Sequence, residues 1–125
     1  MISLDYKDKR PLYEQISEKL KELMAVGGFM ENSRLPSVRA LAVDLSINPN
    51  TIQRAYAELE RQGYIYSIKG KGNFVAETKV LQYLKSEELK ERFSKLVEEA
   101  IRLGMSDDEI MGYIERTLSE RRAMQ

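Results

Sequence analysis

Apolar residues recur at helical spacing in three segments of the first half of the chain. The first segment covers about residues 11–26 and the second about 37–45, with Ser37 placed as an N-cap. The third begins after Asn48, another capping residue, and ends before Gly63. Because polar residues fill the intervening positions, the pattern predicts three amphipathic helices, each with one face toward a core.

The third segment has two chemically different faces. Its apolar residues occupy positions i, i+3, i+4 and i+7 and predict the buried stripe: Ile52, Ala55, Tyr56 and Leu59. At about 100° per residue, the opposite face consists of Asn50, Arg54, Ala57 and Arg61. A surface of amides, arginines and one small residue suits contact with a nucleic-acid groove.

Two β-rich segments follow, over residues 64–68 and 73–76, and residues 69–72 (Lys-Gly-Lys-Gly) join them. Glycine accepts positive φ without steric cost, so this connection predicts a hairpin. A plain tight turn with solvated lysines is the alternative interpretation. Tyr56 and Phe74 fall on the inward period of their elements, which predicts that both rings belong to the core.

Two short helices followed by a small hairpin are the parts of a winged helix-turn-helix. The outward helix of such a unit fits the major groove of duplex DNA, where each base pair displays a distinct pattern of donors and acceptors. The fold class is therefore predicted as mainly α with a small β-hairpin. Residues 1–78 are predicted to form the DNA-binding domain.

Helical periodicity returns from about residue 79. One apolar stripe precedes Gly104, and Ser106 with Glu109 forms a capping box that opens a last helix with a second stripe. Two helices of this size have little to bury between only themselves, so residues 79–125 are predicted to form a helical dimerisation region. Packing back onto the first domain is the alternative. The residues expected at the dimer interface are Leu89, Phe93, Leu96, Val97, Ile101, Ile110, Ile114 and Leu118.

Composition narrows the possible chemistry. The 125 residues are 42% hydrophobic, enough for a core, and include neither Cys nor His. Thiolate nucleophiles, thiolate metal sites and the commonest general base are therefore absent, and we expect no enzyme, no cofactor and no metal. Without an apolar run of membrane-spanning length or a signal peptide, the sequence predicts a cytoplasmic protein with no membrane partner.

Charge is balanced overall but uneven along the chain. The formal net charge is +0, whereas residues 34–75 carry +3 and the remainder −3. A local positive face attracts phosphate even on a neutral protein. The neutral total favours the alternative of a protein-interaction module that uses the winged fold as a scaffold.

Several sequence blocks in a fixed order resemble the GntR family of bacterial transcription regulators, and within it the YtrA-like subfamily with a short two-helix C-terminal region. The resemblance spans the full length. Its blocks are residues 11–16, 35–42, 48–52, 55–60, 63–65 and 70–75.

The resemblance implies contacts with DNA at three places: the start of the second helix, the recognition helix that follows, and the wing, whose glycines let the tip approach the minor groove. Many family members have arginine where Pro49 and Gln53 stand here, and we expect Arg54 to take over part of that role. Together with the outward helix face and the hairpin, the predicted DNA-binding residues are Ser37, Arg39, Asn50, Thr51, Gln53, Arg54, Lys69, Gly70, Lys71 and Gly72.

These observations predict a homodimeric, sequence-specific repressor that binds an inverted-repeat operator. Only 47 residues follow Thr78, too few for a sizeable ligand-binding domain, and the existence of a small-molecule effector stays open. The acidic pairs Glu87-Glu88 and Glu98-Glu99 are interpreted as solvated helix faces rather than as a catalytic acid and base.

Overall fold

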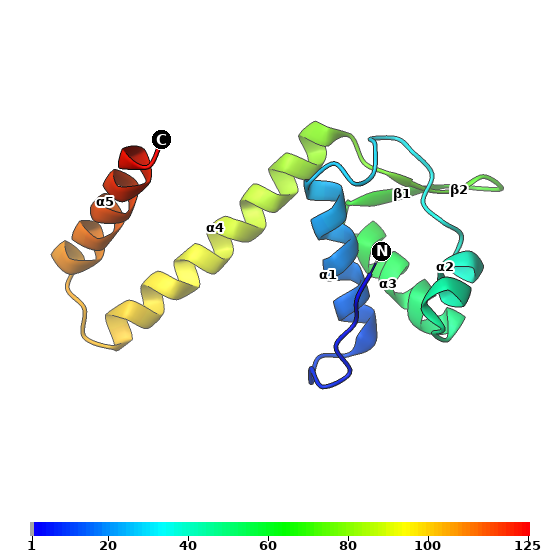
Figure 1. Cartoon of the computed structure of the whole chain (residues 1–125), viewed down its shortest axis with the longest axis horizontal. Coiled ribbons are helices and arrows are strands. Elements are labelled where there is room, and N and C mark those ends of the chain that lie inside the picture. Colours follow the sequence, from blue (N-terminus) through cyan, green and yellow to red (C-terminus); the bar gives the residue numbers. More distant parts are fainter. Residues whose placement is uncertain (1) are drawn as a thin grey trace. The chain divides into compact units, whose positions relative to one another are not determined.

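Helices and strands follow one another in the predicted order in the computed structural model (Figure 1), which describes residues 2–125. Met1, which the predicted first domain includes, lies outside the described residues. The elements are α1 (Leu12–Ala25), α2 (Val38–Leu45), α3 (Pro49–Gln62), β1 (Ile65–Ile68), β2 (Gly72–Val75), α4 (Thr78–Arg102) and α5 (Asp107–Ala123). The predicted fold class is confirmed.

The helix boundaries follow from side-chain caps. Ser37 Oγ accepts a hydrogen bond from the backbone N–H of Ala40 at 3.0 Å, and Asn48 Oδ1 accepts one from Asn50 at 2.8 Å. Each bond satisfies a donor that the first turn of a helix leaves without a partner. At the other end of α3, Gly63 takes the left-handed conformation with φ 88°. The predicted caps of α2 and α3 are therefore confirmed.

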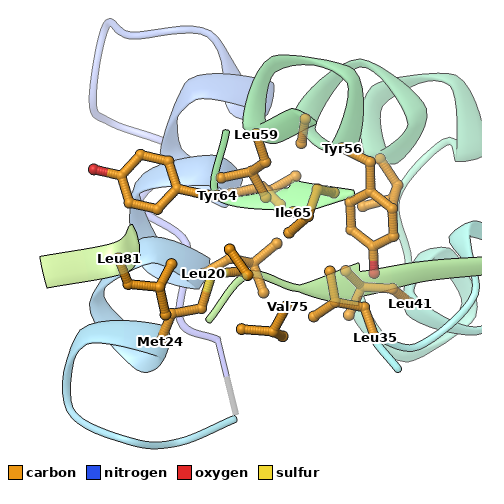
Figure 2. Packing of buried hydrophobic residues seen from close by; sticks show 14 of the residues in the cluster. Leu20, Met24, Leu35, Leu41, Tyr56, Leu59, Tyr64, Ile65, Val75 and Leu81 are labelled. Atoms are coloured by element: carbon orange, nitrogen blue, oxygen red, sulfur yellow. The ribbon is translucent and has the colours of Figure 1, made fainter. Parts of the chain in front are cut away.

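The core lies where α1 and α2 pack against α3 and where β1 follows it. Figure 2 shows side chains from these helices and from both strands gathering in one cluster. The stripe predicted for α3 is fully buried, with exposed fractions of 0–1%. The cluster consists of Ile16, Leu20, Met24, Leu35, Leu41, Ala42, Ile52, Ala55, Tyr56, Leu59, Tyr64, Ile65, Val75, Ala76 and Leu81.

The hairpin is an antiparallel pair in which Ile65 lies opposite Val75 and Ile68 opposite Gly72. Gly72 is thus the first residue of β2 rather than part of the connecting turn. The segment before α2 runs alongside β2 through a bridge between Arg34 and Phe74. This additional pairing ties the approach to α2 to the hairpin.

The prediction for Tyr56 is confirmed, but the prediction for Phe74 is wrong. Tyr56 is 1% exposed in the core, whereas Phe74 is half-buried outside the core cluster and stacks on Tyr66 with ring centroids 5.6 Å apart. Successive side chains of a strand point to opposite faces. Because Val75 faces the core, its neighbour Phe74 faces away, so the inward positions of this strand are shifted by one residue from the predicted ones.

The chain divides into two compact units, one ending at Lys85 and the other covering Ser86–Gln125. The beginning of α4 packs with the first unit, where Leu81 is 6% exposed. The predicted division between residues 78 and 79 stays a prediction about domains. In the second unit, the predicted capping box of α5 is present, with Ser106 Oγ accepting from the Glu109 N–H at 3.1 Å.

Across residues 2–125 we find no helix with both the length and the apolar character needed to cross a bilayer.

The fold predicts a stability effect at Tyr56. Its hydroxyl donates to the carbonyl oxygen of Pro36 at 2.7 Å, and burial raises the pKa of this hydroxyl to about 12. Tyr56→Phe leaves the carbonyl without that donor and should lower the free energy of unfolding by about 1–2 kcal/mol. Urea denaturation measures the change, with Tyr83→Phe, at an exposed tyrosine, as the control. Equal effects of the two substitutions would contradict the assigned bond.

Candidate nucleic-acid interface

The first turns of α3 present the polar residues of the predicted recognition face. Asn50, Gln53 and Arg54 are exposed, and Thr51 is half-buried. Pro49 occupies the first helical position and has no backbone N–H to donate. The capping residue Asn48 is exposed. The exposed face is the one predicted from the helical period.

Arg54 lies against α1 through an interaction that the sequence did not predict. Its guanidinium carbon is 4.0 Å from the centroid of the Tyr13 ring, which is the geometry of a cation–π contact. Arg54 remains exposed while Tyr13 is half-buried. The ring therefore supports one side of the guanidinium, and the exposed donors stay available to an anion.

Arg61 lies further along the same face but is engaged within the protein. Its guanidinium forms an ion pair with Glu58, and Nε donates to Glu58 Oε2 at 3.0 Å. Gln62 Nε2 donates to the same carboxylate at 2.6 Å. The hydrogen bonds from Arg61 and then from Gln62 lower the pKa of Glu58 to about 2. Of the two arginines on this face, Arg54 is thus the one with no carboxylate partner among residues 2–125.

The start of α2 combines a cap with a free cation. Ser37 uses its hydroxyl to cap the helix, as predicted. Arg39 is exposed and forms no ion pair within the described part of the chain. Together with the free N–H groups of a helix N-terminus, this arginine forms a surface suited to phosphate.

The wing carries Lys69 and Lys71, both exposed, beside Gly70 with φ 77° and Gly72 with φ 119°. Positive φ values favour glycine, and Gly70 lies in the predicted turn while Gly72 begins β2. Glu60 is the carboxylate bound to the hairpin, where it accepts a hydrogen bond from Ser67 Oγ at 2.9 Å.

Backbone and side-chain contacts join the three predicted DNA-binding elements within one unit. The Tyr56 hydroxyl connects α3 to Pro36, next to the cap of α2. The Leu35 N–H donates to the Asn73 carbonyl at 2.9 Å and connects the same segment to β2. The start of α2, helix α3 and the wing are therefore held by one network of contacts.

The second unit contains an apolar groove of about 440 Å³ between α4 and α5. Five of the predicted interface residues line it: Phe93, Leu96, Val97, Ile110 and Ile114. The remaining predicted residues, Leu89, Ile101 and Leu118, are exposed and do not line it. Leu96 is 63% exposed, and α5 contributes no buried residue.

Over residues 2–125, acidic side chains do not form a group of three or more that could hold a metal ion.

Comparisons with known proteins identify a family and similar regulators. The family model described as "Bacterial regulatory proteins, gntR family" matches residues 12–75. The chain is 35% identical over 116 residues to the HTH-type transcriptional repressor YtrA of Bacillus subtilis, covering 91% of this chain and 89% of that protein. A transcriptional regulator from Oenococcus oeni has a similar structure, with a TM-score of 0.78, 33% identity and coverage of 94% of this chain and 99% of the other.

A further solved structure contains DNA. The DNA-binding domain of AraR in complex with operator ORE1 matches with a TM-score of 0.53 and 28% identity, over 61% of this chain and 93% of that domain.

The ion pair of α3 predicts an altered titration. Glu58 should titrate near pH 2 in the parent protein, and Arg61→Ala should move its pKa back toward 4.5. Because folding lowers this pKa, the carboxylate's contribution to stability is complete above about pH 4.5 and is lost as the pH falls toward 2. NMR titration of the side-chain carbonyl measures both values. Arg102→Ala serves as a control, and a parent Glu58 that titrates in the ordinary range would refute the assigned pair.

Proposed function

Because the chain belongs to the gntR family of bacterial regulatory proteins, which are DNA-binding transcriptional regulators rather than enzymes, we propose that it acts as a homodimeric repressor of an inverted-repeat operator. The observation that carries this proposal is the exposed start of α3, where Arg54 lies free of carboxylates beside polar side chains. The YtrA relative supports the role of repressor.

Recognition of base edges is assigned to α3. An α-helix fits the major groove, and an arginine or amide there can read a base through paired hydrogen bonds. Arg54 and Gln53 are proposed to provide these bonds, with Asn50 and Thr51 at the start of the helix. The structure of AraR bound to operator supports placement of this domain on DNA.

Contacts with the DNA backbone are assigned to the neighbouring elements. Arg39 and the N-terminus of α2, with Ser37, are proposed to bind phosphate. The hairpin, with Lys69 and Lys71 and the glycines Gly70 and Gly72, is proposed to approach the adjacent minor groove. These contacts position α3 without reading sequence themselves.

Dimerisation is assigned to the apolar groove of the second unit and the exposed side chains near it. An exposed apolar patch of this kind marks an interaction site in a globular protein. The proposed occupant is the same region of a second copy, because two-fold symmetry pairs two recognition helices with the two halves of an inverted repeat. A bound repressor at such a site would occlude the promoter.

Selection of genomic DNA fragments by the purified protein, at near-physiological salt, tests the proposed function. Sequencing of the retained fragments should reveal a few sites that share an inverted repeat. Uniform or absent retention would contradict the proposal. Retention of a single half-site by a monomer would contradict the dimeric part of it.

Substitutions of two basic residues should have different effects on the retained DNA. Arg54→Ala is expected to weaken operator binding by about 1–3 kcal/mol and to relax base preference at one position. Lys71→Ala is expected to weaken binding to all sequences alike and to reduce the salt dependence by about one phosphate contact. Fluorescence anisotropy with operator and scrambled duplexes measures both, and unchanged affinity in both variants would exclude the proposed interface.

A charge placed in the apolar groove should separate the dimer. Leu96→Glu puts a carboxylate among apolar side chains and should raise the dimer dissociation constant by at least roughly tenfold, since an unpaired buried charge is costly. Val26→Glu, at a residue 81% exposed in the first unit, is the matched control. Sedimentation velocity measures the masses, and a dimer unaffected by Leu96→Glu would place the interface elsewhere.

A further inference from the structure

We propose that Arg34 contacts the DNA backbone beside the wing. The absence of a side chain at Gly72 leaves the space in which the Arg34 guanidinium lies. Neither the helical pattern nor the family blocks single out Arg34, because it lies in the loop before α2. The inference rests on the DNA binding proposed above and adds a cation outside the predicted set of contacts.

The backbone of Arg34 is held in a fixed register beside β2. The Asn32 N–H donates to the Val75 carbonyl at 2.8 Å, and the Val75 N–H donates to the Ser33 carbonyl at 2.9 Å. The Leu35 N–H then donates to Asn73, and Leu35 is 2% exposed in the core. Because side chains alternate along an extended segment, Arg34 points away from the core, on the face that carries Phe74.

The side chain of Arg34 lies against Gly72. A Cβ on Gly72 would lie 2.9 Å from Arg34 Nε and 3.5 Å from both Cζ and Nη2. Gly72 also has φ 119°, which side chains rarely adopt. The φ of Gly72 therefore disfavours a side chain, and a Cβ at this position would also displace the guanidinium of Arg34 from its present place.

The guanidinium has no anionic partner within the protein. Arg34 is exposed and forms no ion pair in the described part of the chain, residues 2–125. Glu60, the carboxylate bound to the hairpin, accepts its hydrogen bond from Ser67, whose side chain lies on the opposite face of the strands. The five donors of a guanidinium placed there are available to an external anion.

The position of Arg34 links the two elements assigned to the DNA backbone. Its side chain reaches Gly72 at the base of the wing turn, and its main chain leads through Leu35 and Pro36 to the cap of α2. A DNA strand whose phosphates contact both the start of α2 and the wing must therefore pass close to Arg34. A planar guanidinium suits phosphate because it can donate two parallel hydrogen bonds.

The experiment measures the affinity of Arg34→Ala for the retained operator fragment and for a scrambled duplex of equal length. Loss of one charge-assisted phosphate contact should weaken binding to both duplexes roughly tenfold. The slope of log affinity against log salt should become shallower by about 0.9. Arg34→Lys should keep most of the slope because it keeps the charge. Lys19→Ala, which removes an exposed cation from α1, is the matched control.

A double-mutant cycle tests the contact between Gly72 and the Arg34 guanidinium. Gly72→Ala should reduce the DNA affinity of the parent protein far more than that of the Arg34→Ala variant, because both changes remove the same contact. Gly70→Ala also places a side chain on a positive φ, 77°, but its Cβ meets no atom within 4 Å, so its effect on DNA binding and that of Arg34→Ala should be additive. Thermal melting of each variant separates loss of fold from loss of contact.

The inference would be overturned if Arg34→Ala had the same slope of log affinity against log salt as the parent, even with a lower affinity. Additive effects of Gly72→Ala and Arg34→Ala on DNA affinity would also overturn it. Failure of the proposed function is a different result, since the parent itself would then retain no operator fragment. If Arg39→Ala and Lys71→Ala weaken binding while Arg34→Ala does not, only the role of Arg34 is refuted.

Discussion

Burial of the apolar stripe of α3 determines which of its side chains face outward. Ile52, Ala55 and Leu59 are completely buried, and Tyr56 adds a hydrogen bond to Pro36 from inside the core. Rotation of α3 about its axis would expose this stripe and bury the charged side chains of the opposite face, and both changes are costly. The polar face at the start of α3 is thus a consequence of core packing, and so is its position beside the cap of α2.

Local pairing of charges matters more here than net charge, which is zero. Glu58 is committed to Arg61, and Glu60 accepts from Ser67 on the hairpin. Within residues 2–125, Arg39 of α2 and the wing residues Lys69 and Lys71 have no carboxylate partners. A neutral protein can therefore present a basic surface to phosphate, although its long-range attraction is weaker than that of a strongly basic protein.

Much of the fold could be predicted because local signals decide it. Each of these signals depends on a single helix: Ser37 caps α2, Asn48 caps α3, and the apolar stripe lies along α3. All three occur in the structure at the predicted positions. The contacts of Tyr13 with Arg54 and of Arg34 with Gly72 could not be predicted, because each joins segments far apart in the sequence. The orientation of Phe74 could not be predicted for a related reason: a short strand shows the alternation of side chains but not which side faces the core. The roles of the candidate site residues remain predictions from pattern and resemblance.

We propose that the start of α3 enters the major groove while the start of α2 and the wing contact the DNA backbone on either side. A crystal structure of the protein with its selected operator tests this most directly. We expect Arg54 at base edges, with Arg39 and the wing cations at phosphates, in two copies related by the two-fold axis of the repeat. A complex in which α3 faces away from the DNA, or in which another surface of the protein contacts the DNA, would refute this assignment of α3 to the major groove.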